Sequence, residues 1–141
     1  MNQHLHLITL GVRDFAKSYK FYTEILGWKP AGASQVDTAF FQAGGIILSI
    51  YPREKLAEDA LVLPEGHGFS GITVAYNAQS ETEVDEIISD LKAKGVKILK
   101  EPQKVFWGGY SSYFADPDGY CWEVAYNPFF PFDENGNLKL E

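Results

Sequence analysis

The chain has 141 residues, of which 45% are hydrophobic and 22% charged, the balance of one folded domain rather than a disordered segment. A single cysteine excludes an intramolecular disulfide and a zinc site with paired cysteines, and the net charge of −7 argues against a nucleic-acid partner. No apolar run is long enough to span a membrane and the first ten residues do not resemble a signal peptide, so we expect a cytoplasmic protein with no membrane partner.

The first part of the chain, residues 5–52, predicts a strand, a helix and three further strands. The helix begins after Asp14, a favoured N-cap, and ends at Gly27, because glycine is the preferred residue just past a helix. Gly44-Gly45 predicts a hairpin turn between the last two strands. The strands share apolar, aromatic and β-branched residues bounded by turn residues, and they cover residues 5–12, 28–33, 38–43 and 46–51.

The second part repeats this order after a polar linker predicted at residues 53–68. Within residues 69–128, Ser80 and Glu83 form a capping box that begins a helix, and residues 116–119 (DPDG) predict a turn. The strands cover residues 69–76, 96–99, 110–115 and 120–126. Neither half is large enough to bury both faces of its own sheet. We therefore expect an α+β fold in which two tandem βαβββ modules form curved mixed sheets around a shared cleft.

Two segments resemble a known family. Ile8–Trp28 (ITLGVRDFAKSYKFYTEILGW) is similar to the opening module of the vicinal oxygen chelate superfamily, and Tyr113–Pro128 (YFADPDGYCWEVAYNP) is similar to its closing hairpin. That superfamily includes glyoxalase I, extradiol dioxygenases, fosfomycin-resistance proteins and bleomycin-binding proteins. The resemblance covers nearly the whole chain and implies a single glyoxalase-like domain, a small-molecule ligand and a homodimer.

The resemblance also indicates where metal ligands would lie. In metal-using members, four ligands come from the first and fourth strands of each module, and here these positions fall on Leu7, Leu48, Gly71 and Glu123. A register slip of one residue would replace Leu48 by Ser49. Only Glu123 has a side chain suited to a transition metal. The sequence therefore predicts a relative without the usual metal site and without a cofactor, which binds an apolar or aromatic molecule in the cleft.

Two alternatives involve catalysis. A glyoxalase-type lyase or isomerase, or a dioxygenase, would need a non-standard divalent metal site built from Glu123 with His6 or His67. Strand alternation turns His6 away from the face of Leu7, which favours the interpretation of His4 and His6 as exposed residues on the outer face. A metal-free enzyme would use Glu123 as a general base. Whether the protein is an enzyme stays open.

Aromatic residues make up 15% of the chain, and some are expected to bind the ligand. Trp107 and Tyr110 flank Gly108-Gly109 and are the candidates for stacking on a ligand, although each ring could equally fill the core. Thr9, Leu48 and Thr73 complete the predicted ligand-binding residues. The aromatic tail after residue 128 begins within the segment NPFFPF and is expected to cover the cavity or a partner subunit.

Overall fold

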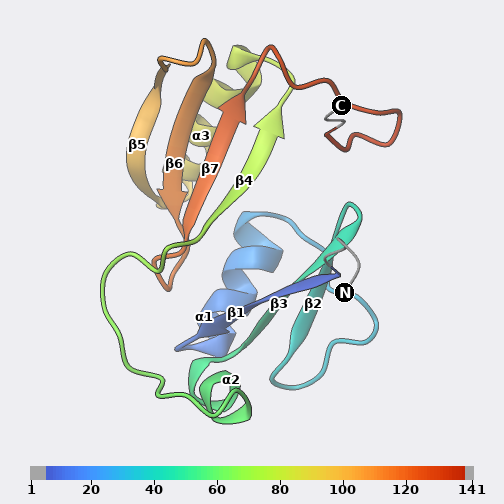
Figure 1. Ribbon diagram of the computed structural model, residues 1–141, viewed down its shortest axis with the longest axis vertical. Helices are drawn as coiled ribbons and strands as arrows, with labels where there is room; N and C mark the ends of the chain where they lie inside the picture. Colours follow the sequence, from blue (N-terminus) through green and yellow to red (C-terminus); the bar gives the residue numbers. More distant parts are fainter. Residues whose placement is uncertain (1–5, 139–141) are drawn as a thin grey trace. The chain divides into compact units, whose positions relative to one another are not determined.

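The computed structural model describes residues 6–138, which form two compact units (Figure 1). Unit 1 runs to Gly66 and includes Glu134–Asn137, and unit 2 runs from His67 to Asp133 and includes Leu138. His4 lies outside the described residues. No helix among the described residues is long and apolar enough to cross a membrane.

Unit 1 contains a three-stranded sheet in the order β1-β3-β2, with β1 parallel and β2 antiparallel to β3. Its core lies between the sheet and the first helix, where the Tyr22 and Trp28 rings pack on Phe41 at centroid distances of 5.6 and 5.9 Å. Its elements are β1 (Leu7–Val12), α1 (Phe15–Lys20), a π-helical continuation η1 (Phe21–Ile25), β2 (Ala39–Ala43), β3 (Ile46–Pro52) and α2 (Arg53–Asp59).

Local signals in unit 1 are mostly confirmed. The Asp14 side chain accepts a hydrogen bond from Lys17 N at 2.9 Å, and Gly27 adopts φ +71° after the helix. The strand predicted at residues 28–33 is wrong, since this segment makes only an isolated bridge between Pro30 and Phe41. Proline lacks the N–H that a strand ladder requires, which accounts for the difference.

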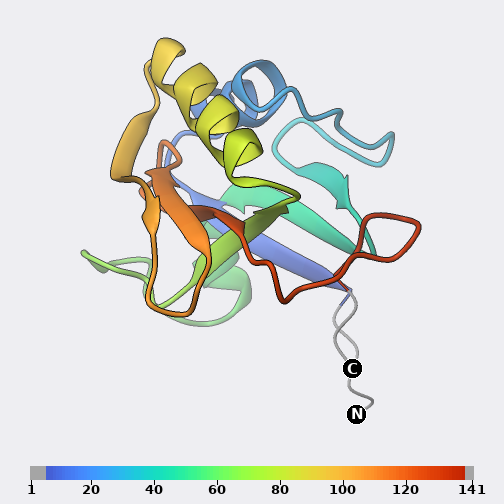
Figure 2. The same cartoon turned by 90° about the horizontal axis from the view of Figure 1, so that it is seen from above.

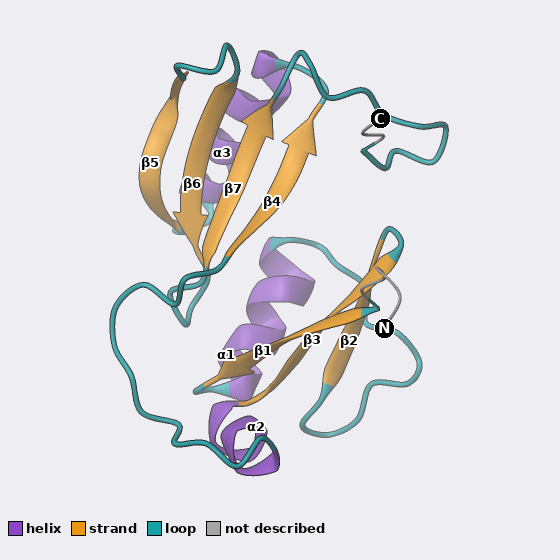
Figure 3. Cartoon of the chain, in the orientation of Figure 1, coloured by secondary structure: helices purple, strands orange, loops and turns teal. Residues whose placement is uncertain are grey.

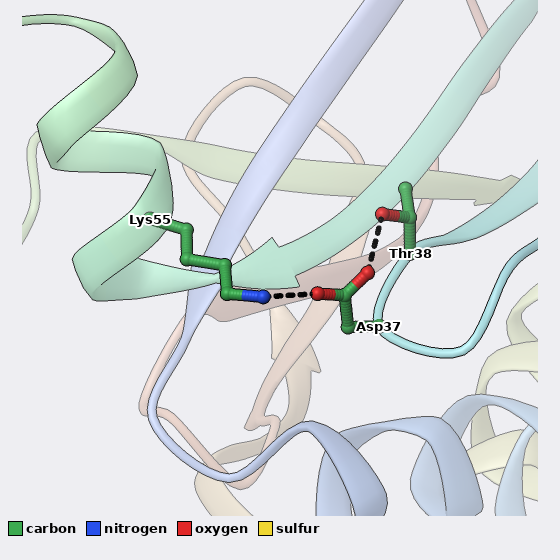
Figure 4. Close-up of polar contacts among 3 residues, drawn as sticks. All are labelled: Asp37, Thr38 and Lys55. Carbon is green, nitrogen blue, oxygen red and sulfur yellow. Dashed lines mark hydrogen bonds and ion pairs between the residues drawn. The ribbon is translucent and has the colours of Figure 1, made fainter.

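The predicted linker opens with the helix α2, which the sequence analysis missed. Arg53–Asp59 is rich in helix-forming residues, and α2 packs directly over Gly11, where a Cβ would lie 3.2 Å from Arg53 Cα. On the surface, Lys55 forms an ion pair with Asp37, whose carboxylate also accepts a hydrogen bond from Thr38 (Figure 4). The predicted linker, as far as Gly66, is therefore part of unit 1.

Unit 2 contains a four-stranded sheet in the order β4-β7-β6-β5, with α3 against one face (Figures 2 and 3). β4 is parallel to β7, and the other pairs are antiparallel. The buried side chains Val84, Ile88 and Leu91 of α3 pack toward the sheet. The elements are β4 (Thr73–Ala78), α3 (Glu81–Ala93), β5 (Lys97–Lys104), β6 (Tyr110–Ala115) and β7 (Cys121–Tyr126).

The predicted elements of unit 2 are present, with shifted ends. Ser80 accepts a hydrogen bond from Glu83 N at 3.1 Å, which confirms the predicted cap of α3. β4 begins at Thr73 rather than residue 69, because Gly71 adopts φ +78° and interrupts the extended chain. β5 continues to Lys104 through Pro102, which an edge strand tolerates. The expected α+β class is confirmed, and the cleft predicted between the modules stays a prediction.

Candidate functional site

The sheet face of unit 2 that lies away from α3 carries Glu123. Side chains alternate along strands, so Trp122 and Val124 are buried toward α3 while Glu123 points to the other face. The register places Ala75 of β4 and Tyr113 of β6 directly beside Glu123. We call this surface the Glu123 face; by register its polar residues are Thr73, Asn77, Lys97, Lys100, Gln103, Ser111, Tyr113, Cys121 and Glu123.

Tyr113 and Glu123 are directly coupled on this face. Burial raises the pKa of the Tyr113 phenol, and the charge of Glu123 and a hydrogen bond to its carboxylate raise that pKa further. Tyr113 therefore stays protonated above its ordinary range, and its hydroxyl group remains a hydrogen-bond donor toward Glu123. A carboxylate with a fixed donor is held in one orientation, as a binding or proton-accepting group requires.

Lys100 of β5 adds a positive charge to the Glu123 face, as the register neighbour of Tyr113. Its Nζ donates a hydrogen bond to Ser111 Oγ at 2.7 Å and lies 5.5 Å from the centroid of the Tyr113 ring. Lys92 and Lys94, by contrast, form ion pairs with carboxylates at 2.6 and 2.7 Å. Within residues 6–138, Lys100 contacts no carboxylate, so its charge is available to an anionic group.

The two aromatic residues predicted to stack on a ligand lie in different places. Trp107 is partly buried in the loop between β5 and β6, with its indole over Gly109. Tyr110 faces α3, where its hydroxyl donates a hydrogen bond to Asp85 Oδ1 at 2.9 Å. The structure therefore does not bring Tyr110 together with Glu123.

The predicted residues of unit 1 also separate onto two sheet faces. Thr9 and Ser49 are register partners and share a face with Leu7. Leu48 points to the opposite face, is 4% exposed and contributes to the core with Leu10 and its neighbours. Leu48 is a core residue because alternation turns it toward α1, and Ser49, the alternative for the second ligand position, lies on the opposite face beside Thr9.

The predicted metal alternative involves residues that do not gather around Glu123 within unit 2. His67 is exposed in the loop before β4, and His6 is exposed just before β1 in unit 1. Gly71 precedes β4, and Ala75 is the residue that faces Glu123. Within residues 6–138, no three His, Cys, Asp or Glu side chains form a cluster able to hold a metal ion. Transition-metal centres take three or four such ligands, and the Glu123 face of unit 2 supplies Glu123 and Cys121.

Lys100, Ser111 and Tyr113 are site residues that sequence reasoning did not select. Alternation along residues 110–115 already places Ser111 and Tyr113 on one face, and that was the available signal. Nothing in the sequence indicated that Lys100 would reach them. β5 pairs with β6 through register shifts on both sides of Lys100, and periodicity does not predict such irregularities.

Comparisons with known proteins agree with this fold. The model of the Glyoxalase/Bleomycin resistance protein/Dioxygenase superfamily matches residues 4–124. The fosfomycin resistance protein FosX of Listeria monocytogenes is 32% identical over 123 residues, 83% of this chain and 84% of FosX. The metallothiol transferase FosB of Staphylococcus saprophyticus is 29% identical over 124 residues, 88% of this chain and 77% of FosB. A glyoxalase-related enzyme from Fulvimarina pelagi superposes with a TM-score of 0.88 and 33% identity over 99% of both chains.

Proposed function

Because the chain belongs to the Glyoxalase/Bleomycin resistance protein/Dioxygenase superfamily, we propose that it binds a small organic molecule on the Glu123 face, without the usual metal site. One fold hosts many functions, so the proposal rests on the site itself. The observation that supports it is the row formed by Lys100, Tyr113 and Glu123 across three adjacent strands. This row offers a cation, a phenol and a carboxylate to one ligand.

The chemistry of the row defines the kind of ligand. Lys100, which Ser111 holds by a hydrogen bond, suits an anionic or strongly accepting group, and Glu123 suits a hydroxyl or amine that donates a hydrogen bond. Ala75, which is exposed, supplies small apolar surface beside these groups, for the apolar or aromatic body expected from the sequence. Glu123 is also the proposed proton acceptor for any reaction at this face, because Tyr113 already orients its carboxylate.

Thermal unfolding with a panel of small organic anions, fosfomycin among them, tests this proposal on protein treated with EDTA. A ligand whose free concentration is 100 times its Kd stabilises the folded state by about 2.7 kcal/mol and raises Tm by several degrees. We expect Lys100→Met and Glu123→Gln to abolish the shift. Glu86→Gln, which makes the same change at an exposed position of α3, is the matched control. Equal shifts in all three variants would place binding elsewhere.

The metal-dependent enzyme is a second candidate, favoured by similarity to FosB, whose name is metallothiol transferase. It requires Glu123 to ligate a divalent ion together with groups such as His6 or His67. Metal analysis of protein purified without chelator separates the two candidates. Near-stoichiometric metal that disappears in Glu123→Gln would support the enzyme and overturn the metal-independent proposal.

The homodimer implied by the family and the cytoplasmic location both stay predictions. Light scattering coupled to size-exclusion chromatography would decide the first, since a monomer and a dimer of this chain differ twofold in mass. Fractionation of cells that express the tagged chain would decide the second.

A further inference from the structure

We infer that the Glu123 face ends in an aromatic shelf, formed by the Trp107 indole seated on Gly109, and that the ligand is an aromatic anion. Its flat ring would stack on Trp107 while its anionic group contacts Lys100, whose ammonium group Ser111 holds from beneath. This inference rests on the proposed function, for which it names the class of ligand.

The direction of position 109 follows from the strand pairing. Gly109 O accepts a hydrogen bond from Val105 N at 3.0 Å, so the ladder between β5 and β6 continues one step beyond Tyr110. Tyr110 itself points toward α3 and bonds Asp85. Alternation therefore directs position 109 to the same face as Ser111 and Tyr113.

The Trp107 ring occupies the space that a side chain at position 109 would fill. A Cβ added to Gly109 would lie 1.6 Å from Cζ3, 2.1 Å from Cη2 and 2.6 Å from Cε3 of Trp107. Gly109 is buried while Trp107 stays partly exposed. The glycine thus lets the indole lie against the backbone on the Glu123 face, and part of the ring stays accessible to a ligand.

The shelf adjoins the cation along one strand. Ser111, the next residue on the same face, holds the Lys100 ammonium at 2.7 Å. Two residues of a strand span about 7 Å, which is the scale of a one- or two-ring aromatic acid. An aromatic ring stacks on an indole more favourably than a saturated ring does, so Trp107 should select for an aromatic ligand. The ammonium group of Lys100 should select for a negatively charged one.

A set of three probes of similar size tests both requirements by NMR titration of isotopically labelled protein. Benzoate has the ring and the charge, cyclohexanecarboxylate has the charge without aromaticity, and benzyl alcohol has the ring without the charge. We expect benzoate to bind about two- to tenfold more tightly than cyclohexanecarboxylate, and to shift the Trp107 indole N–H resonance. Benzyl alcohol should bind more weakly than benzoate.

Two variants remove the shelf by different routes. Trp107→Leu deletes the ring, and Gly109→Ala displaces it while leaving every polar group in place. Both should abolish the preference for benzoate over cyclohexanecarboxylate and leave the affinity for cyclohexanecarboxylate unchanged. Gly45→Ala makes the same glycine substitution where nothing lies within 4 Å, and Phe106→Leu removes a fully exposed ring from the same loop; both controls should keep the preference.

The outcomes separate this inference from the proposed function. Equal binding of benzoate and cyclohexanecarboxylate, lost in Lys100→Met, would overturn the aromatic shelf and leave the proposed function standing. A benzoate preference that survives in both Trp107→Leu and Gly109→Ala would also overturn the shelf. Binding of none of the three probes to the native protein would contradict both proposals.

Discussion

Replacement of Leu61 by glycine should stabilise the protein, because Leu61 is the described non-glycine residue with a positive φ, +56°. It follows α2 in the position that glycine usually occupies. Leu61 N donates to Glu58 O at 3.0 Å and Val62 N donates to Ala57 O at 2.9 Å, which is the paired arrangement typical of a glycine-terminated helix. The side chain is 91% exposed, so its removal forfeits almost no buried apolar area.

Two opposing effects determine the size of the gain. A left-handed conformation costs a residue with a Cβ about 1–2 kcal/mol, and glycine relieves that cost. Glycine also loses more conformational freedom on folding, worth about 0.5–1 kcal/mol. The expected net effect of Leu61→Gly is therefore an increase of about 0.5–1 kcal/mol in the free energy of unfolding. Urea denaturation followed by circular dichroism should show a higher midpoint with an unchanged slope.

Two control variants isolate the backbone effect. Leu61→Ala removes the same exposed side chain but keeps the Cβ, so its stability should stay within about 0.5 kcal/mol of the native protein. Leu63→Gly introduces glycine at an 83% exposed position without a positive φ, and should destabilise by about 0.5–1 kcal/mol. If Leu61→Gly is no more stable than Leu61→Ala, the account of strain at this helix end is refuted.

Three further changes test the fold and the site. The raised pKa of Tyr113 contributes stability that is complete below the ordinary tyrosine pKa and is lost as pH rises through the higher folded value. In urea unfolding between pH 9 and 11.5, the free energy of unfolding should therefore decline less steeply for Tyr113→Phe than for the native protein. An identical decline in the two proteins would contradict the coupling between Tyr113 and Glu123. Gly11→Ala should destabilise by about 1 kcal/mol because the α2 backbone at Arg53 must shift by a few tenths of an ångström, and native-like thermal stability would disprove that close contact. Phe41→Ala should lower the free energy of unfolding by about 3–5 kcal/mol and shift the fluorescence of Trp28 to longer wavelength. An unshifted spectrum would argue against the packing of Trp28 on Phe41.

Short-range physical chemistry determined the helix ends and turns of this protein. Asp14 and Ser80 cap helices because their side-chain oxygens reach backbone N–H groups within the next three residues. Gly27 and Gly95 follow helices because a left-handed residue is needed there. Alternation likewise placed Ser111 and Tyr113 on one face, opposite Tyr110, before any contact was known. Interactions of this kind involve neighbours in the chain, so the sequence contains them.

The tertiary structure decided which of these residues meet. Leu48 became a core residue and Ser49 the partner of Thr9, since that choice depends on the pairing register between β1 and β3 rather than on either strand alone. Lys100 reached Ser111 only through the irregular pairing of β5 with β6. The Trp107 ring lies against residue 109 because glycine has no Cβ to occupy that space. Each of these contacts joins side chains through backbone geometry that periodicity does not encode, and those of Lys100 and Trp107 belong to the proposed site.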